Sequence, residues 1–168
     1  MRIIIIGPPG AGKSTLAKSL GLALNIAKVH QLDFFFWKPG WKKTSHQERL
    51  EILKVLTVDN SWILEGNYTN TLSFQLTKAN VAIFLHIPIH ICIWRIILQQ
   101  FGYLFQEPPE IAPGCRDRFS YNFLKSILTF YPIDFKIFSE EIKLHKNVKL
   151  IYLHNTREIK EFLNNPGL

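Results

Sequence analysis

A glycine-rich segment near the start of the chain has the residue types and spacing that bind phosphate groups. It directly follows the apolar run 3–6 and reads Gly7-Pro8-Pro9-Gly10-Ala11-Gly12-Lys13-Ser14. This matches the pattern G-x-x-x-x-G-K-[ST], in which backbone N–H groups and the N-terminus of the next helix surround the phosphates. The Lys13 ammonium would reach the outer phosphates, and the Ser14 hydroxyl would bind Mg²⁺. The sequence therefore predicts a site for a nucleoside triphosphate with its magnesium ion.

Two carboxylates follow predicted strands and are candidates for the chemistry beside that site. Phosphoryl transfer needs Mg²⁺, fixed positive charge and a group that orients the acceptor. Asp33 comes just after the second predicted strand, where it could orient an acceptor hydroxyl or hold a water on Mg²⁺. Glu65 leaves the third predicted strand and is the second candidate. The structural alternatives are a turn or cap role for Asp33 and an exposed loop carboxylate for Glu65.

Three of the arginines could clamp phosphate oxygens. Arg95, Arg116 and Arg118 flank or lie in a segment rich in proline and glycine, residues 102–118, which separates two predicted helices. We expect this segment to be a mobile lid loop. The planar fork of arginine pairs with two phosphate oxygens at once, although each of these residues could instead form a surface ion pair.

Several other residues that often carry chemistry are ambiguous here. The aromatic segment 34–41 could stack on an acceptor ring or pack over the edge of the sheet, and the sequence leaves both open. His86 and His90 are four residues apart but span a strand end and Pro88, which argues against a helical metal site. The two cysteines, Cys92 and Cys115, have no metal-binding spacing and are expected to be reduced.

Apolar runs and helical patterns alternate along the chain, which is typical of a parallel sheet built from βα units. The predicted strands are Arg2–Ile6, Ala27–Gln31, Trp62–Leu64, Val81–His86 and Lys149–Leu153. The predicted helices are Ser14–Leu24, Gln47–Leu56, Ile89–Phe101, Phe119–Phe130, Phe135–His145 and a last helix after Asn155, with Asn155 and Glu158 as a capping pair. In such doubly wound sheets, ligands bind at the carboxyl ends of the strands.

Composition limits the class of protein. The chain has 168 residues, 47% of them hydrophobic, and fits a single globular domain over 1–168. It enters the first strand at once and has no long apolar segment, so we expect a cytoplasmic protein with no membrane partner. The net charge of +7 suits a protein that handles polyanions, nucleotides included.

Taken together, several motifs resemble the bacterial family called DNA topology modulation proteins, which is similar to adenylate kinase and other small P-loop kinases. The motifs are the phosphate loop, Asp33, Lys38-Pro39-Gly40-Trp41, Glu65-Gly66-Asn67-Tyr68, Trp94-Arg95 and Gly114-Cys115-Arg116-Asp117-Arg118-Phe119. The resemblance implies a P-loop NTPase fold, a three-layer α/β/α sandwich whose five-stranded parallel sheet has the order 2-3-1-4-5, with a closing lid. It also implies nucleotide and Mg²⁺ binding by Gly10, Gly12, Lys13, Ser14 and Thr15, an acidic role for Asp33 and a lid arginine at Arg95.

Residues and resemblance together predict an ATP- and Mg²⁺-dependent kinase that phosphorylates a small acceptor, a nucleotide or a metabolite. Lys13, Asp33, Arg95, Arg116 and Arg118 are the candidate catalytic residues. Two alternatives stay open. One is a nucleotide-dependent DNA-binding regulator, suggested by the family name and the basic charge, although the lysines are spread along the chain. The other is an ATP-binding sensor without transfer, because Gln99 stands where adenylate kinases usually repeat an arginine.

Overall fold

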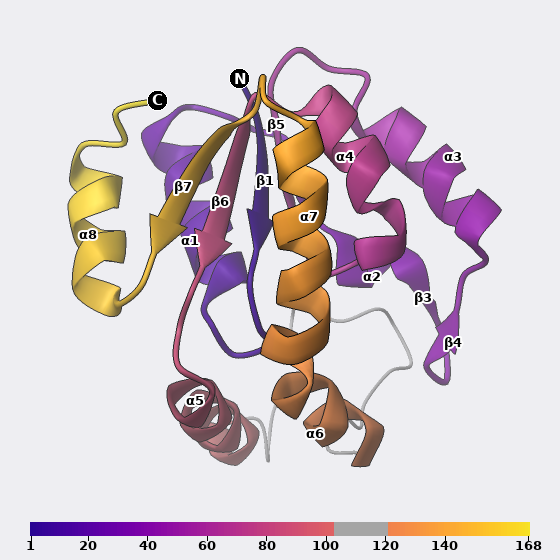
Figure 1. Ribbon diagram of the computed structural model, residues 1–168, viewed down its shortest axis with the longest axis vertical. Helices are drawn as coiled ribbons and strands as arrows, with labels where there is room; N and C mark the ends of the chain where they lie inside the picture. The colour runs from indigo at the N-terminus through magenta and orange to yellow at the C-terminus, as the bar shows by residue number, and fades with distance from the viewer. Residues whose placement is uncertain (103–120) are drawn as a thin grey trace.

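The computed structural model describes residues 1–102 and 121–168, and its centre is a five-stranded parallel sheet (Figure 1). The strands of this sheet are β1 (Arg2–Ile6), β2 (Val29–Gln31), β5 (Trp62–Glu65), β6 (Val81–Leu85) and β7 (Lys149–Leu153). Their spatial order is β2-β5-β1-β6-β7. Counted along the chain, this is the predicted order 2-3-1-4-5, and the predicted parallel sheet is confirmed.

Helices cover both faces of the sheet. They are α1 (Lys13–Ala23), α2 (Leu32–Phe36), α3 (His46–Leu56), α4 (Leu72–Lys78), α5 (Ile89–Gly102), α6 (Tyr121–Leu128), α7 (Lys136–Leu144) and α8 (Thr156–Asn164). Figure 1 shows α1 and α8 on one side of the sheet, and α4 and α7 on the other. The strands β6 and β7 point toward the end of the molecule where α5 and α6 lie.

Side chains of the central strand alternate between two cores. Ile4 and Ile6 pack with Phe84 and Phe138 in the core beneath α4 and α7. Ile3 and Ile5 belong to the opposite core, which α1 and α8 cover. Because β1 is buried on both faces, it reads as a continuous apolar run, as expected for a parallel sheet between two helical layers.

Two helix starts follow from their capping residues. The Asn155 side chain accepts a hydrogen bond from the backbone N–H of Glu158 at 2.9 Å, and so caps α8 as predicted. At α3, Ser45 and Glu48 form a capping box in which each side chain accepts from the other's backbone N–H. Such reciprocal bonds satisfy two of the free donors at a helix start.

The structure also contains short elements that the sequence analysis did not predict. The segment after β2 forms α2 and a two-stranded antiparallel sheet of β3 (Trp37–Lys38) and β4 (Lys42–Lys43). A 3-10 turn, η1 (Thr69–Thr71), leads into α4. Between α6 and α7 the chain stays helical through the π-helical segment η2 (Phe130–Phe135). These elements are too short, or too uniformly apolar, to show a clear hydrophobic period.

The predicted lid, residues 102–118, falls almost wholly on residues that the structure does not describe. Arg116, Arg118 and Cys115 lie among them. In the two described ranges, every helix is too short or too polar to cross a lipid bilayer.

Candidate phosphate and acceptor site

The segment from Gly7 to Gly12 joins the carboxyl end of β1 to the start of α1. Gly10 and Gly12 have φ of +79° and +97°, in the left-handed region that favours glycine. Gly12 is the N-cap of α1, whose first turn has neither a side-chain cap nor an acidic residue. The first N–H groups of this helix are therefore free of a capping side chain and, with the helix dipole, favour an anion.

Lys13 and Arg95 bring two positive charges to this loop. The Lys13 ammonium donates to the backbone oxygen of Pro8 at 3.1 Å, so the side chain crosses the mouth of the loop. From α5, the Arg95 guanidinium donates to the backbone oxygen of Ala11 at 3.0 Å and to the Thr156 hydroxyl at 2.9 Å. Arg95 therefore links the loop to the start of α8. The family resemblance predicts a lid arginine at this position, and the structure places it on α5, in direct contact with the loop.

A hydroxyl and a carboxylate suited to Mg²⁺ meet beside the loop. The Ser14 hydroxyl donates to Oε1 of Glu65 at 2.8 Å. Glu65 ends β5, next to β1 in the sheet, and is only 6% exposed. Mg²⁺ prefers hard oxygen ligands and is commonly held by one or two carboxylates together with substrate phosphates. Ser14 and Glu65 fit this ion, and the exposed-loop alternative for Glu65 is wrong because the residue is buried.

Asp33 lies in the first turn of α2 and is held by Tyr68, whose hydroxyl donates to Oδ1 of the carboxylate. Because β2 pairs with β5 and Gln31 lies opposite Glu65, Asp33 and Tyr68 both leave the same edge of the sheet. Burial contributes most to the raised pKa of Tyr68. The negative charge of Asp33 and the hydrogen bond between Tyr68 and Asp33 raise this pKa further. The phenol therefore stays protonated and acts as a donor.

Sequence reasoning missed Arg49, a buried arginine of α3 beside this pair. Its guanidinium lies over the rings of Phe36 and Tyr68, with 5.3 and 5.4 Å between Cζ and the two ring centroids. An arginine in an amphipathic helix usually indicates a solvent-facing position. The available signal was its spacing, since Arg49 is four residues before the buried Leu53 and so lies on the same helix face.

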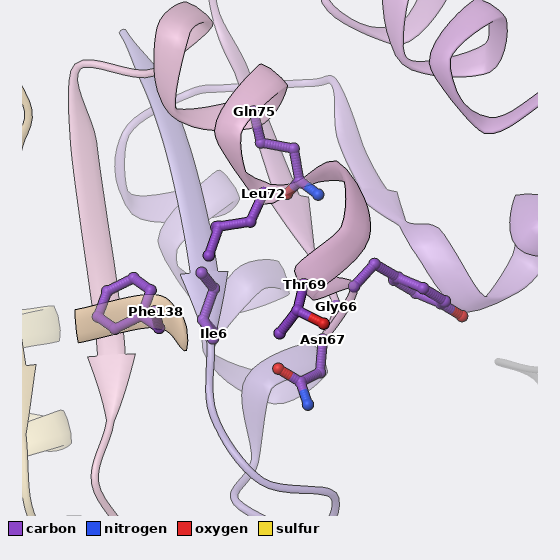
Figure 2. A pocket seen from close by; sticks show the side chains of 8 residues that line it. Ile6, Gly66, Asn67, Thr69, Leu72, Gln75 and Phe138 are labelled. Atoms are coloured by element: carbon purple, nitrogen blue, oxygen red, sulfur yellow. The ribbon is translucent and has the colours of Figure 1, made fainter. Parts of the chain in front are cut away.

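A small cavity lies at the carboxyl ends of β1 and β5 (Figure 2). In Figure 2, Ile6 comes from β1, Gly66 and Asn67 follow β5, and Leu72 and Gln75 come from α4. The cavity volume is about 10 Å³, roughly the space that one water molecule needs. It is too small for a nucleotide or an acceptor, so the ligand-binding space lies outside it.

The structure also places two further candidates, His86 and Cys92. His86 does not pair with His90; its Nδ1 lies 3.2 Å from Nδ1 of His154, at the ends of the neighbouring strands β6 and β7. Cys92 is buried and free, and burial raises the pKa of its thiol. Among the described residues, no group of three or more histidine, cysteine, aspartate or glutamate side chains could hold a metal ion.

This chain is similar to known proteins in its three-dimensional structure and not in its sequence. No protein-family model matches the sequence. No curated protein matches it either. Among solved structures, shikimate kinase from Acinetobacter baumannii in complex with shikimate superposes with a TM-score of 0.64 at 14% identity, over 98% of this chain and 89% of that one.

Two further structures are similar. Shikimate kinase from Aquifex aeolicus gives a TM-score of 0.51 at 19% identity, over 99% of this chain and 96% of that one. A sugar kinase from Janibacter gives 0.55 at 16% identity, over 97% and 92%. At such identities the likeness concerns the fold. The chain therefore shares the α/β fold of these solved kinase structures.

Proposed function

We propose that the protein transfers the terminal phosphoryl group of ATP, with Mg²⁺, to a hydroxyl group of a small acceptor. The observation that carries this proposal is the convergence at one sheet edge of the phosphate loop, two cations and two carboxylates. Further support comes from the structural neighbours, which are named as shikimate and sugar kinases.

The phosphate loop would hold the triphosphate. Backbone N–H groups would bind the phosphate oxygens over the segment Gly7, Pro8, Pro9, Gly10, Ala11, Gly12, Lys13, Ser14 and Thr15, in which the two prolines shape the turn because they have no N–H. The ammonium of Lys13 would neutralise charge on the transferring group, and Arg95 would pair with a phosphate oxygen. Ser14 and Glu65 would hold the Mg²⁺, which neutralises phosphate charge when bound. Arg116 and Arg118 remain predicted clamps.

Asp33 would act on the acceptor. In the transfer, the acceptor oxygen bonds to the terminal phosphorus while the bond from that phosphorus to the bridging oxygen breaks, and ADP leaves. The acceptor hydroxyl loses its proton, which Asp33 accepts or directs to solvent. This chemistry depends mainly on position and charge.

The test is transfer of labelled terminal phosphate from ATP and Mg²⁺ to a panel of nucleotides, nucleosides, sugars and hydroxy acids. Lys13→Ala should lower the rate by roughly 10²-fold or more, since it removes a charge that acts in the transition state. Lys78→Ala, which removes an exposed lysine at the end of α4, is the matched control and should keep full activity. Circular dichroism should show that both variants are folded.

Two outcomes would contradict the proposal. Equal transfer by wild type and a folded Lys13→Ala would remove Lys13 from the mechanism. ATP binding without transfer to any acceptor would favour the sensor alternative. The DNA-binding alternative receives no support from the structural neighbours reported above, and only a preference for one DNA sequence or topology at physiological salt would revive it.

A further inference from the structure

Two histidines meet at the carboxyl ends of β6 and β7 and take no part in the proposed transfer. Leu85 and Leu153 are register partners at the ends of these parallel strands, and His86 and His154 are the residues that follow them. The backbone N–H of His86 donates to the backbone oxygen of Leu153 at 2.8 Å, which extends the pairing by one step. The Nδ1 atoms of the two histidines lie 3.2 Å apart, and neither side chain has another hydrogen-bond partner among the described residues.

Aromatic neighbours hold both imidazole rings in place. The His86 ring stacks on Phe135 at an interplanar angle of 10° and contacts Tyr131 edge to face. The His154 ring stacks on Tyr152 at an interplanar angle of 21°. Such ring contacts fix the orientation of a side chain and leave its nitrogen atoms unused. The two Nδ1 atoms are therefore positioned before any ligand binds.

The separation of these nitrogens fits two ligands of one metal ion. Zn²⁺ binds imidazole nitrogen at about 2.0–2.1 Å in tetrahedral geometry, which places two ligand nitrogens about 3.3–3.4 Å apart. The observed 3.2 Å needs only a small adjustment to reach this value. His154 is exposed and His86 is half-buried, so water can reach the pair and fill the other positions around an ion.

The surroundings leave both imidazoles available as neutral ligands. Burial lowers the pKa of His86, and His154 lowers it further. The salt bridges of the described residues involve neither histidine. Glu158 is engaged, since its two carboxylate oxygens accept from the backbone N–H of His154 and from the side-chain amide of Asn155. Neutral imidazole is the form that binds transition metals.

We propose that His86 and His154 form a site for Zn²⁺ or a similar transition-metal ion, bound through their two Nδ1 atoms with water in the remaining positions. Imidazole suits such ions, whereas Mg²⁺ prefers oxygen ligands. The site is therefore distinct from the proposed Mg²⁺ site at Ser14 and Glu65, and it does not depend on the proposed transfer. A bound ion ties the end of β6 to the end of β7.

The first experiment is calorimetric titration of the full chain with Zn²⁺ at neutral pH, in excess Mg²⁺, which occupies sites made of oxygen ligands. His154→Gln removes one of the two protein ligands from an exposed position and should weaken Zn²⁺ binding about tenfold or more, because loss of a group around a metal typically costs at least this much. His46→Gln, which changes an exposed histidine at the start of α3, is the matched control and should bind as wild type does. Absence of saturable binding by wild type, or equal binding by wild type and His154→Gln, overturns the proposal.

Nuclear magnetic resonance of the imidazole nitrogens identifies the bound atoms. On addition of Zn²⁺, the Nδ1 signals of both His86 and His154 should shift together, while their Nε2 atoms keep the proton. His86→Gln should abolish the shift at His154 as well, because one imidazole alone binds the ion weakly. A shift at one histidine only, or a shift at His154 that persists in His86→Gln, overturns the shared site.

Thermal unfolding separates this site from the proposed function. Zn²⁺ should raise the melting temperature of wild type and not that of His154→Gln, since an ion that binds the folded state stabilises it. Equal rises in the two proteins would place the ion elsewhere and overturn the proposal. Both proteins should also gain stability from Mg²⁺ with a non-hydrolysable ATP analogue. If neither does while the response to Zn²⁺ depends on His154, the proposed function is wrong and the zinc site stands.

Discussion

At the scale of single residues, Ser14 and Glu65 are the proposed ligands of Mg²⁺. The Ser14 hydroxyl donates to the Glu65 carboxylate, so their two oxygens lie 2.8 Å apart. Glu65 has little access to solvent because it ends a strand that is buried between two neighbours. A carboxylate at this depth, beside a phosphate loop, is suited to a divalent cation or one of its bound waters.

We predict that Glu65→Gln raises the Mg²⁺ concentration needed for half-maximal transfer by about tenfold or more, since loss of a metal-orienting group typically costs 10–100-fold. Glutamine keeps the size of the side chain and can still accept from Ser14. The measurement is a Mg²⁺ titration of activity, together with a Mg²⁺-dependent melting temperature in the presence of the ATP analogue. Glu161→Gln, which changes an exposed carboxylate on α8, is the control. If Glu65→Gln needs no more Mg²⁺ than this control, Glu65 is excluded from the metal site.

At the scale of elements, the phosphate loop keeps its shape because it packs against α5. A Cβ on Gly10 would lie 2.5 Å from the backbone oxygen of Cys92 and 2.9 Å from Cγ1 of Ile96. Arg95, on the same helix, bonds the loop at Ala11. The loop therefore depends on α5 for its conformation, and a change at their contact should alter both stability and nucleotide binding.

Gly10→Ala should lower the free energy of unfolding by about 2–4 kcal/mol, because it combines a left-handed φ with a clash against backbone. Gly40→Ala is the control that separates the strain of a left-handed φ from the clash, since Gly40 has φ of +72° and open space around it. Its free energy of unfolding should fall by only about 1 kcal/mol. Urea unfolding gives both values, and ATP titration should show weaker binding for Gly10→Ala alone. Equal losses in the two variants would mean that the loop moves away from α5 at little cost.

At the scale of the whole molecule, His86 lies where three elements meet. Its ring stacks on Phe135 of η2 at an interplanar angle of 10°, contacts Tyr131 edge to face, and faces His154 at the end of β7. Burial lowers the pKa of His86, and the neighbouring His154 lowers it further. The contact between η2 and the edge of the sheet is therefore most favourable when His86 is neutral.

Stability should fall as pH decreases below about 6.5, where a histidine of the unfolded chain gains a proton that folded His86 resists. The expected result is a lower melting temperature at pH 5.5 than at pH 7.5. His86→Phe, which keeps the stacking, should reduce this difference. His30, whose pKa is lowered chiefly by burial, contributes in the same direction, so the double variant His30→Gln/His86→Phe should be flatter still. An identical pH dependence in wild type and His86→Phe would contradict this explanation.

Many features of the fold could be predicted from the sequence because their signals are local. The glycine pattern, the buried strand before it and the alternation of apolar runs with helical stretches lie within short windows of the chain. The last helix was placed from its capping pair, Asn155 and Glu158, which are three residues apart. Where such signals are weak the sequence predicted no element, as in the aromatic segment that forms α2 and β3.

The sequence by itself determined the five strands of the sheet, and it predicted the phosphate-binding roles of Lys13 and Ser14 and the candidate role of Asp33. Only the tertiary structure decided which side chains meet. Tyr68 reaches Asp33 across 35 positions, Ser14 reaches Glu65 across 51, and Arg95 reaches Ala11 across 84. Burial of Arg49 likewise depends on Phe36 and Tyr68, which belong to other elements. Such contacts form when parallel strands bring distant segments to one sheet edge, and no local pattern in the chain encodes that meeting.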